Sequence, residues 1–140
     1  MSSTGLDTFD TTLQETNALL HEIEIALSWE GHRRKTYDAL RAVLQTLRDR
    51  MTIEETAHFS AQLPLLIRGI FYEGWDPTRV PIKMDKGRFL QRITQLGNFT
   101  EDVDTEQTVR VIMQSLKSFV NAGEIEDVKG ILPKDIASLM

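Results

Sequence analysis

Apolar residues recur along this chain at intervals of three and four positions, the spacing that places them on one face of an α-helix. No segment shows a sustained alternation of apolar and polar residues, which would indicate a β-strand. The pattern therefore predicts an all-α protein with eight helices. Their expected ranges are 12–28, 34–50, 52–62, 64–72, 85–96, 104–120, 123–129 and 133–140.

Several of the expected helix starts carry residues that can cap exposed backbone N–H groups. Thr12 and Thr52 each stand three residues before a glutamate, a spacing that predicts two capping boxes. Asp85 and Asp104 are expected to cap the fifth and sixth helices with their carboxylates. Pro64 suits the first turn of the fourth helix, where its missing backbone N–H costs nothing.

A Leu-Pro step occurs twice, about 69 residues apart, and its surroundings are repeated with it. Aligned on this step without a gap, residues 39–71 fall onto residues 108–140. Identical pairs include Arg41 and Arg110, Gln45 and Gln114, Leu47 and Leu116, Glu55 and Glu124, and Ile67 and Ile136. Self-similarity at one offset is the mark of a duplicated unit. We therefore expect two pseudo-symmetric four-helix units, with Leu63 and Leu132 buried in equivalent positions.

The repeat and the loop signals divide the 140 residues into four parts. Residues 1–11 are expected to form a disordered or frayed N-terminus. Residues 12–72 form the first helical repeat and residues 85–140 the second. The linker loop between them, residues 73–84, contains Gly74, Pro77 and Pro81. A unit of fewer than about 70 residues buries little apolar surface alone, so we expect the two to pack as one compact domain.

Composition and charge exclude several classes of protein. Apolar residues make up 41% of the chain and charged residues 26%, values typical of a globular domain. The formal net charge of -5 argues against a general affinity for nucleic acid. Because the chain has no cysteine, it can form neither a disulfide framework nor a zinc–thiolate site. Neither a membrane-spanning apolar run nor a secretory signal is present, so we expect a cytoplasmic protein without a membrane partner.

No catalytic constellation stands out in the sequence. Neither a GxSxG nucleophile turn nor a GxxxxGK[ST] phosphate loop occurs, and the carboxylates single out no acid–base pair. Glu54 and His58 stand four residues apart on one helical face, which can place two ligands on a metal ion, and the second repeat has Asp127 in place of His58. Isolated pairs of this kind are common on solvated helices. We therefore predict no catalytic, cofactor-binding or metal-binding residues, and no enzyme.

The densest basic stretch comprises Arg33, Arg34 and Lys35, and Arg41 and Arg48 can extend it along one side of the second helix. It could form a patch for nucleic acid or an acidic partner. The simpler interpretation, which we favour, is a solvated helix start. Cations at a helix N-terminus nevertheless oppose the helix dipole, which indicates a role beyond helix stability.

The segment Phe71–Pro77 is the most distinctive local stretch, and Tyr72, Trp75 and Asp76 are its candidate interaction residues. Aromatic residues in a loop can anchor a protein interface. They can equally fill the seam between the two units, with Asp76 and Pro77 forming a turn. We favour the seam.

The long central motif resembles a known bacterial family, the one catalogued as domain of unknown function 2267. The residues that carry this resemblance are Arg41-Ala42-Val43-Leu44, Leu47-Arg48-Asp49-Arg50, Glu54-Glu55-Thr56-Ala57-His58, Ala61-Gln62-Leu63-Pro64, Ile67-Arg68-Gly69-Ile70 and Tyr72-Glu73-Gly74-Trp75. It implies a small helical bacterial protein of the cytoplasm with two related halves. It carries over no catalytic residue.

These features lead to a functional hypothesis with one alternative. The leading hypothesis is a non-catalytic protein-interaction or regulatory module whose partner is either an unidentified protein or a second copy of the chain. The alternative is a nucleic-acid-associated protein that uses the basic residues of the first repeat.

Overall fold

The computed structural model of the protein describes residues 3–140, and helices are the only regular secondary structure over that range. The eight helices are α1 (Asp7–Leu27), α2 (Arg33–Asp49), α3 (Ile53–Ser60), α4 (Leu65–Tyr72), α5 (Lys86–Leu96), α6 (Thr105–Leu116), α7 (Ala122–Ile131) and α8 (Lys134–Ala137). The all-α prediction is therefore confirmed. No helix within residues 3–140 combines the length and the apolar character that a bilayer crossing requires.

Helix α1 starts five residues earlier than the sequence pattern predicts, so the expectation of a frayed segment over residues 1–11 is wrong from Asp7 onward. Residues 1 and 2 lie outside the described part of the chain. Asp7 and Asp10 stand in the first turn, where negative charge complements the helix dipole. The carboxylate of Asp10 also accepts a hydrogen bond from the backbone N–H of Thr4. Thr12 consequently lies inside the helix and does not cap it.

The other predicted N-cap acceptors bond as expected, but the reciprocal bond of the predicted capping box, from the Thr52 N–H to the Glu55 carboxylate, is not formed. Thr52, Asp85 and Asp104 each accept a hydrogen bond from the backbone N–H three residues further on. Asn121 does the same at the start of α7. Extended proline residues precede the two remaining short helices, Pro64 before α4 and Pro133 before α8.

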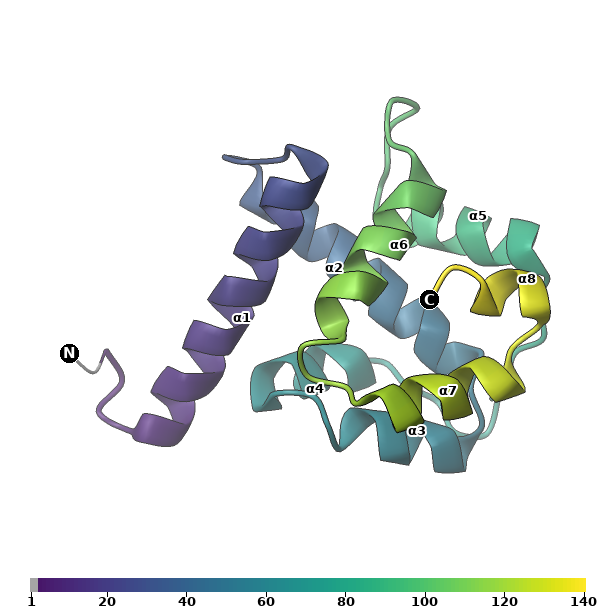
Figure 1. The fold of residues 1–140 in the computed structure, drawn as a ribbon, viewed down its shortest axis with the longest axis horizontal. Helices are drawn as coiled ribbons and strands as arrows, with labels where there is room; N and C mark the ends of the chain where they lie inside the picture. Colours follow the sequence, from purple (N-terminus) through teal and green to yellow (C-terminus); the bar gives the residue numbers. More distant parts are fainter. Residues whose placement is uncertain (1–2) are drawn as a thin grey trace.

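Helix α2 crosses the centre of the molecule and supplies much of its core (Figure 1). It contacts α5 and α4 most extensively, and also α1 and α6. Helix α1 lies along one side against α6 and α4, and α3 lies beside α7 (Figure 1). Leu63 and Leu132 are both buried in the core, as predicted for each. One continuous apolar core therefore joins residues from both halves of the sequence.

A buried ion network ties the first half of the chain to α5. Asp49, at the end of α2, accepts hydrogen bonds from Arg48 at 2.8 Å and from Arg92 at 2.5 Å. Its backbone carbonyl accepts a further bond from the N–H of Ile82 in the connecting loop. This network fixes the end of α2 against α5 and the connecting loop.

Candidate functional site

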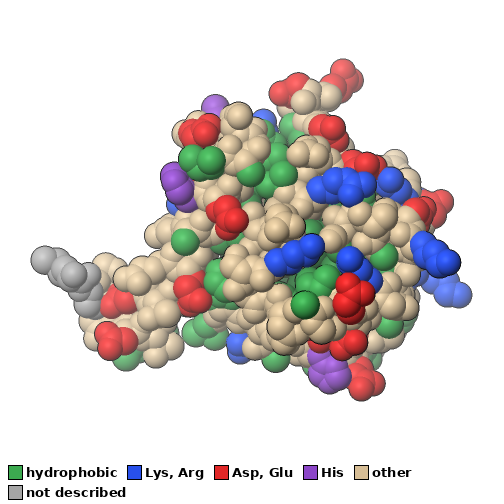
Figure 2. Space-filling model, viewed as in Figure 1, with side chains coloured by type: hydrophobic (Ala, Val, Ile, Leu, Met, Phe, Trp, Pro, Cys, Tyr) green, Lys and Arg blue, Asp and Glu red, His purple; other side chains and the backbone are tan. Residues whose placement is uncertain are grey.

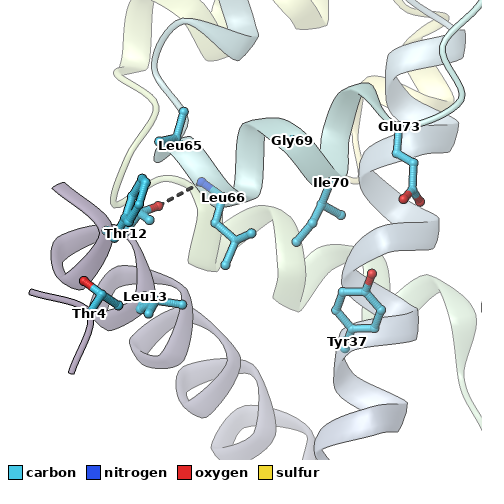
Figure 3. Close-up of a pocket in the computed structure, with 10 residues that line it drawn as sticks. Thr4, Thr12, Leu13, Tyr37, Leu65, Leu66, Gly69, Ile70 and Glu73 are labelled. Atoms are coloured by element: carbon cyan, nitrogen blue, oxygen red, sulfur yellow. Dashed lines mark hydrogen bonds between the residues drawn. The ribbon is translucent and has the colours of Figure 1, made fainter. Parts of the chain in front are cut away.

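An apolar groove lies between the N-terminal half of α1, the start of α2 and α4 (Figure 3). Its volume is about 590 Å³. The apolar residues that line it are Phe9, Leu13, Tyr37, Leu65, Leu66 and Ile70. Figure 3 shows the side chains of Leu13, Leu66 and Ile70 directed into the space between α1 and α4, with Tyr37 at its far end.

The walls of the groove carry large apolar side chains that are open to solvent. Phe9, Leu13, Leu65 and Leu66 are between 38% and 50% exposed. They make up four of the eight exposed large apolar side chains within residues 3–140, and Leu6 adds a fifth just before α1. Single exposed apolar residues are normal on a protein surface, whereas a cluster of them around a concavity marks a binding surface.

One hydrogen bond fixes the two walls relative to each other. The hydroxyl of Thr12 on α1 accepts a bond of 2.8 Å from the backbone N–H of Leu66 in the first turn of α4 (Figure 3). This N–H has no partner within its own helix, so Thr12 caps α4 from a distant segment. The groove is therefore held open by a contact that does not depend on a ligand.

The remaining lining is polar but carries little charge. Thr4, Thr12, Glu73 and the backbone of Gly69 complete it, and the carboxylate of Glu73 accepts a hydrogen bond of 3.2 Å from Arg41 on α2. The groove therefore offers apolar contact and shape rather than groups for acid–base or nucleophilic chemistry.

The aromatic residues at the end of α4 and just after it pack against one another and against the core of the first half. Tyr72 lies 5.3 Å from Trp75 between ring centroids and 5.3 Å from Phe71, which in turn contacts Phe59 in the core. The hydroxyl of Tyr72 is hydrogen-bonded to Ser60 at 2.8 Å. These contacts make Tyr72 an extension of the core, with Trp75 half-buried on its face.

Asp76 forms a local turn with Thr78. Its carboxylate accepts bonds from both the backbone N–H and the hydroxyl of Thr78, and these bonds lower the pKa of Asp76. The turn agrees with the predicted role of Asp76 in shaping the loop.

The predicted basic residues do not form one open patch. Arg48 is only 4% exposed and donates hydrogen bonds to Asp49 and to two backbone carbonyls, so its assignment to a surface patch is wrong. The reason is that Asp49 and the end of α4 surround its guanidinium with acceptors. The other four residues are on the surface but engaged. Arg33 pairs with Glu24, Arg34 with Asp38, and Arg41 with Glu73, while the Lys35 ammonium lies 4.4 Å from the ring centre of Trp29.

The sequence pattern does not predict the groove. The signals that it offers are the pair Leu65 and Leu66 at the start of α4, and Leu6 and Phe9 in the segment expected to be frayed. Periodicity places these residues on helices but does not show that the two helices face each other with a space between them.

The sequence matches one described family over most of its length. The family is described as an uncharacterized conserved protein (DUF2267), and the match covers residues 16–139. No curated protein matches the chain. Phe9 and Leu13 precede the matched range, whereas the α2 and α4 walls of the groove lie within it.

Proposed function

The chain belongs to the DUF2267 family, and we propose that it is a non-catalytic interaction module that holds an amphipathic helix of a partner protein in the groove between α1 and α4. The cluster of exposed apolar residues around a preformed groove carries this proposal. A cytoplasmic location and the absence of catalysis are parts of the same proposal.

The shape of the groove favours a helix as its occupant. Its two walls are helices, and the space between them, about 590 Å³, lies within the range of about 300–1,000 Å³ that is usual for ligand clefts. An amphipathic helix presents apolar residues at positions i, i+3, i+4 and i+7, which form one continuous ridge that inserts between two helical walls.

Charge favours a different protein over a second copy of this chain. The formal net charge is -5, so two copies repel each other as they approach. The first turn of α1, at the edge of the groove, carries Asp7 and Asp10. A partner helix with lysine or arginine beside its apolar ridge would complement these carboxylates.

A pair of synthetic peptides tests the occupant. One is a helical peptide with leucine at i, i+3, i+4 and i+7 and lysine elsewhere, and the other has glutamate in place of lysine. Fluorescence anisotropy should show saturable binding of the lysine peptide and much weaker binding of the glutamate peptide. Equal binding of both, or binding of neither, would contradict the proposal.

Substitutions in the groove locate the binding surface. Leu13→Lys and Leu66→Lys should each weaken binding of the lysine peptide by about tenfold or more, because each places a charge in the apolar wall. Both side chains are exposed, so neither change disturbs the core. Ile25→Lys is the matched control, since Ile25 is an exposed apolar residue of α1 outside the groove. Sedimentation equilibrium should show a monomer, and a dimer that Leu66→Lys dissociates would instead make the second copy the occupant.

Nucleic-acid association, the alternative hypothesis, draws no support from the positions of the basic residues. Arg33, Arg34 and Arg41 are paired with carboxylates, and Arg48 is buried. We expect no binding of duplex DNA or RNA even at about 50 mM salt, where phosphate contacts are strongest.

The internal duplication is a further part of the proposal, and the helix contacts support it. Helix α1 packs against α6 and, reciprocally, α5 packs against α2. The contacts α1 with α4 and α5 with α8 correspond in the same way. An experimental structure in which α1–α4 does not superimpose on α5–α8 would overturn the duplication.

A further inference from the structure

Two glutamates from equivalent positions of the sequence repeat face each other where α3 lies beside α7. Glu55 belongs to the first turn of α3 and Glu124 to the first turn of α7. Their carboxylates, together with the imidazole of His58 one turn further along α3, form a cluster whose ligand atoms all lie within 4.8 Å of one another. Figure 2 shows a histidine and several carboxylates gathered on the surface over α3.

The cluster contains buried oxygen atoms without hydrogen-bond donors. Glu124 is only 6% exposed, and its Oε2 has no hydrogen-bond partner. The Oε1 atom of Glu55 is likewise buried and without a partner. An unpartnered carboxylate oxygen costs the full penalty of its lost hydration, so such oxygens are normally paired with a donor or a cation. These two atoms therefore call for either a proton or a metal cation between the two helices.

The arrangement of the three ligand atoms suits a small cation. Even if all three ligand atoms were 4.8 Å apart, an ion placed at equal distance from them would lie about 2.8 Å from each. Side-chain adjustments of under about 1 Å would bring all three to the 2.0–2.2 Å of zinc–oxygen and zinc–nitrogen bonds. Glu55 and His58 stand three positions apart on one helix, a spacing that places both on the same face.

We propose that Glu55, His58 and Glu124 bind a divalent first-row transition-metal ion such as Zn²⁺. The imidazole nitrogen favours such an ion over Mg²⁺ or Ca²⁺, which prefer oxygen ligands alone. Two carboxylates neutralise the charge of the ion, and three protein ligands leave a coordination position for water. The ion joins α3 of the first repeat to α7 of the second and so stabilises the contact between them. This inference does not depend on the groove.

The ligand set differs from the pair that the sequence suggested. Spacing alone singled out Glu54 and His58 on one helix, with Asp127 as the counterpart of His58 in the second repeat. In the structure Glu55 joins His58, and the third ligand comes from the other repeat.

Zinc titration of the full chain tests the site. After treatment with EDTA and dialysis, isothermal titration calorimetry with ZnCl₂ should show one equivalent bound, and the thermal unfolding midpoint should rise. His58→Ala and Glu124→Gln should each weaken zinc binding by about 100-fold or more, because each removes a ligand. Glu54→Gln and Glu126→Gln are matched controls and should bind as the unsubstituted chain does, since both side chains are exposed neighbours outside the cluster.

Three results would each overturn the proposal. The unsubstituted chain fails to bind zinc, His58→Ala or Glu124→Gln binds zinc as tightly as the unsubstituted chain, or the two control variants lose as much affinity for zinc as the ligand variants. Because His58 is exposed, its substitution leaves the fold intact and keeps the test decisive even where Glu124→Gln is poorly folded.

Discussion

The hydroxyl of Thr12 accepts a hydrogen bond of 2.8 Å from the backbone N–H of Leu66, although 54 residues separate them. This contact caps α4, whose own N-terminal neighbour, Pro64, supplies no side-chain acceptor. A side chain of α1 thereby caps α4 and sets the distance between the two walls of the groove.

Replacing Thr12 by alanine should destabilise the protein by about 1 kcal/mol, the usual effect of losing a helix cap. Thr11→Ala is the control, because the neighbouring threonine is exposed. Urea unfolding measures both variants. Equal free energies of unfolding for the two would show that the bond from Leu66 contributes nothing. If the bond holds the groove open, Thr12→Ala should also weaken binding of the lysine peptide.

Removing the charge of Asp49 should have a larger effect. Asp49→Asn leaves the buried guanidinium of Arg48 without its carboxylate and removes the partner of Arg92. Breaking one side of a buried ion network in this way costs about 3–5 kcal/mol. Asp38→Asn, which breaks the solvent-facing pair with Arg34, should cost less than about 1 kcal/mol. Similar urea midpoints for the two variants would contradict the assignment of a structural role to Asp49.

The sequence was informative where the physical cause is local. Thr52, Asp85 and Asp104 cap the helices that follow them because each acceptor and its N–H donor are three residues apart. The same rule failed at Thr12, although its spacing to the next glutamate fits a capping box. The backbone there was already helical from Asp7, so its hydroxyl was free to reach α4.

The candidate sites depend on contacts between distant segments, which local patterns do not encode. Arg48 looks like a surface cation in sequence, but the carbonyls of Phe71 and Glu73 enclose it. The repeat placed Glu55 and Glu124 at equivalent positions without showing that α3 and α7 lie side by side. Matching positions in a sequence repeat can lie far apart in space, so the repeat alone does not predict a contact between them.

Acid should weaken the contact between α1 and the start of α2. A hydrogen bond and the charge of Arg33 lower the pKa of Glu24 below its ordinary value. The ion pair therefore stabilises the fold fully at a pH above the ordinary pKa of a glutamate. This stabilisation is lost as the pH falls through the lowered pKa of Glu24. Glu24→Gln should be destabilised at pH 7 and should approach the unsubstituted chain at low pH. Glu22→Gln, at an exposed position on the same helix, should show no such convergence in urea unfolding.

Alkali should weaken the contact between α3 and α7 when no metal ion is bound. Burial is the main cause that raises the pKa of Glu124, to about 8, and Glu55 and Asp127 add to it. Glu124 consequently holds a proton at neutral pH, which supplies the donor that its pair with Glu55 otherwise lacks. His58 is the remaining ionisable group of the cluster.

The sign of this effect follows from linkage. The folded-state pKa of Glu124 lies above the ordinary value of 4.5. The protonated carboxyl group therefore stabilises the fold fully at a pH below 4.5, and this stabilisation is lost as the pH rises through about 8. Urea unfolding in EDTA at several values between pH 5 and pH 9, compared with Glu124→Gln, isolates this contribution. The unsubstituted chain should lose stability relative to the variant as the pH rises, because the amide has no proton to release. A constant difference across this range would show that Glu124 is ionised in the folded protein throughout, and that its charge is neutralised by another group.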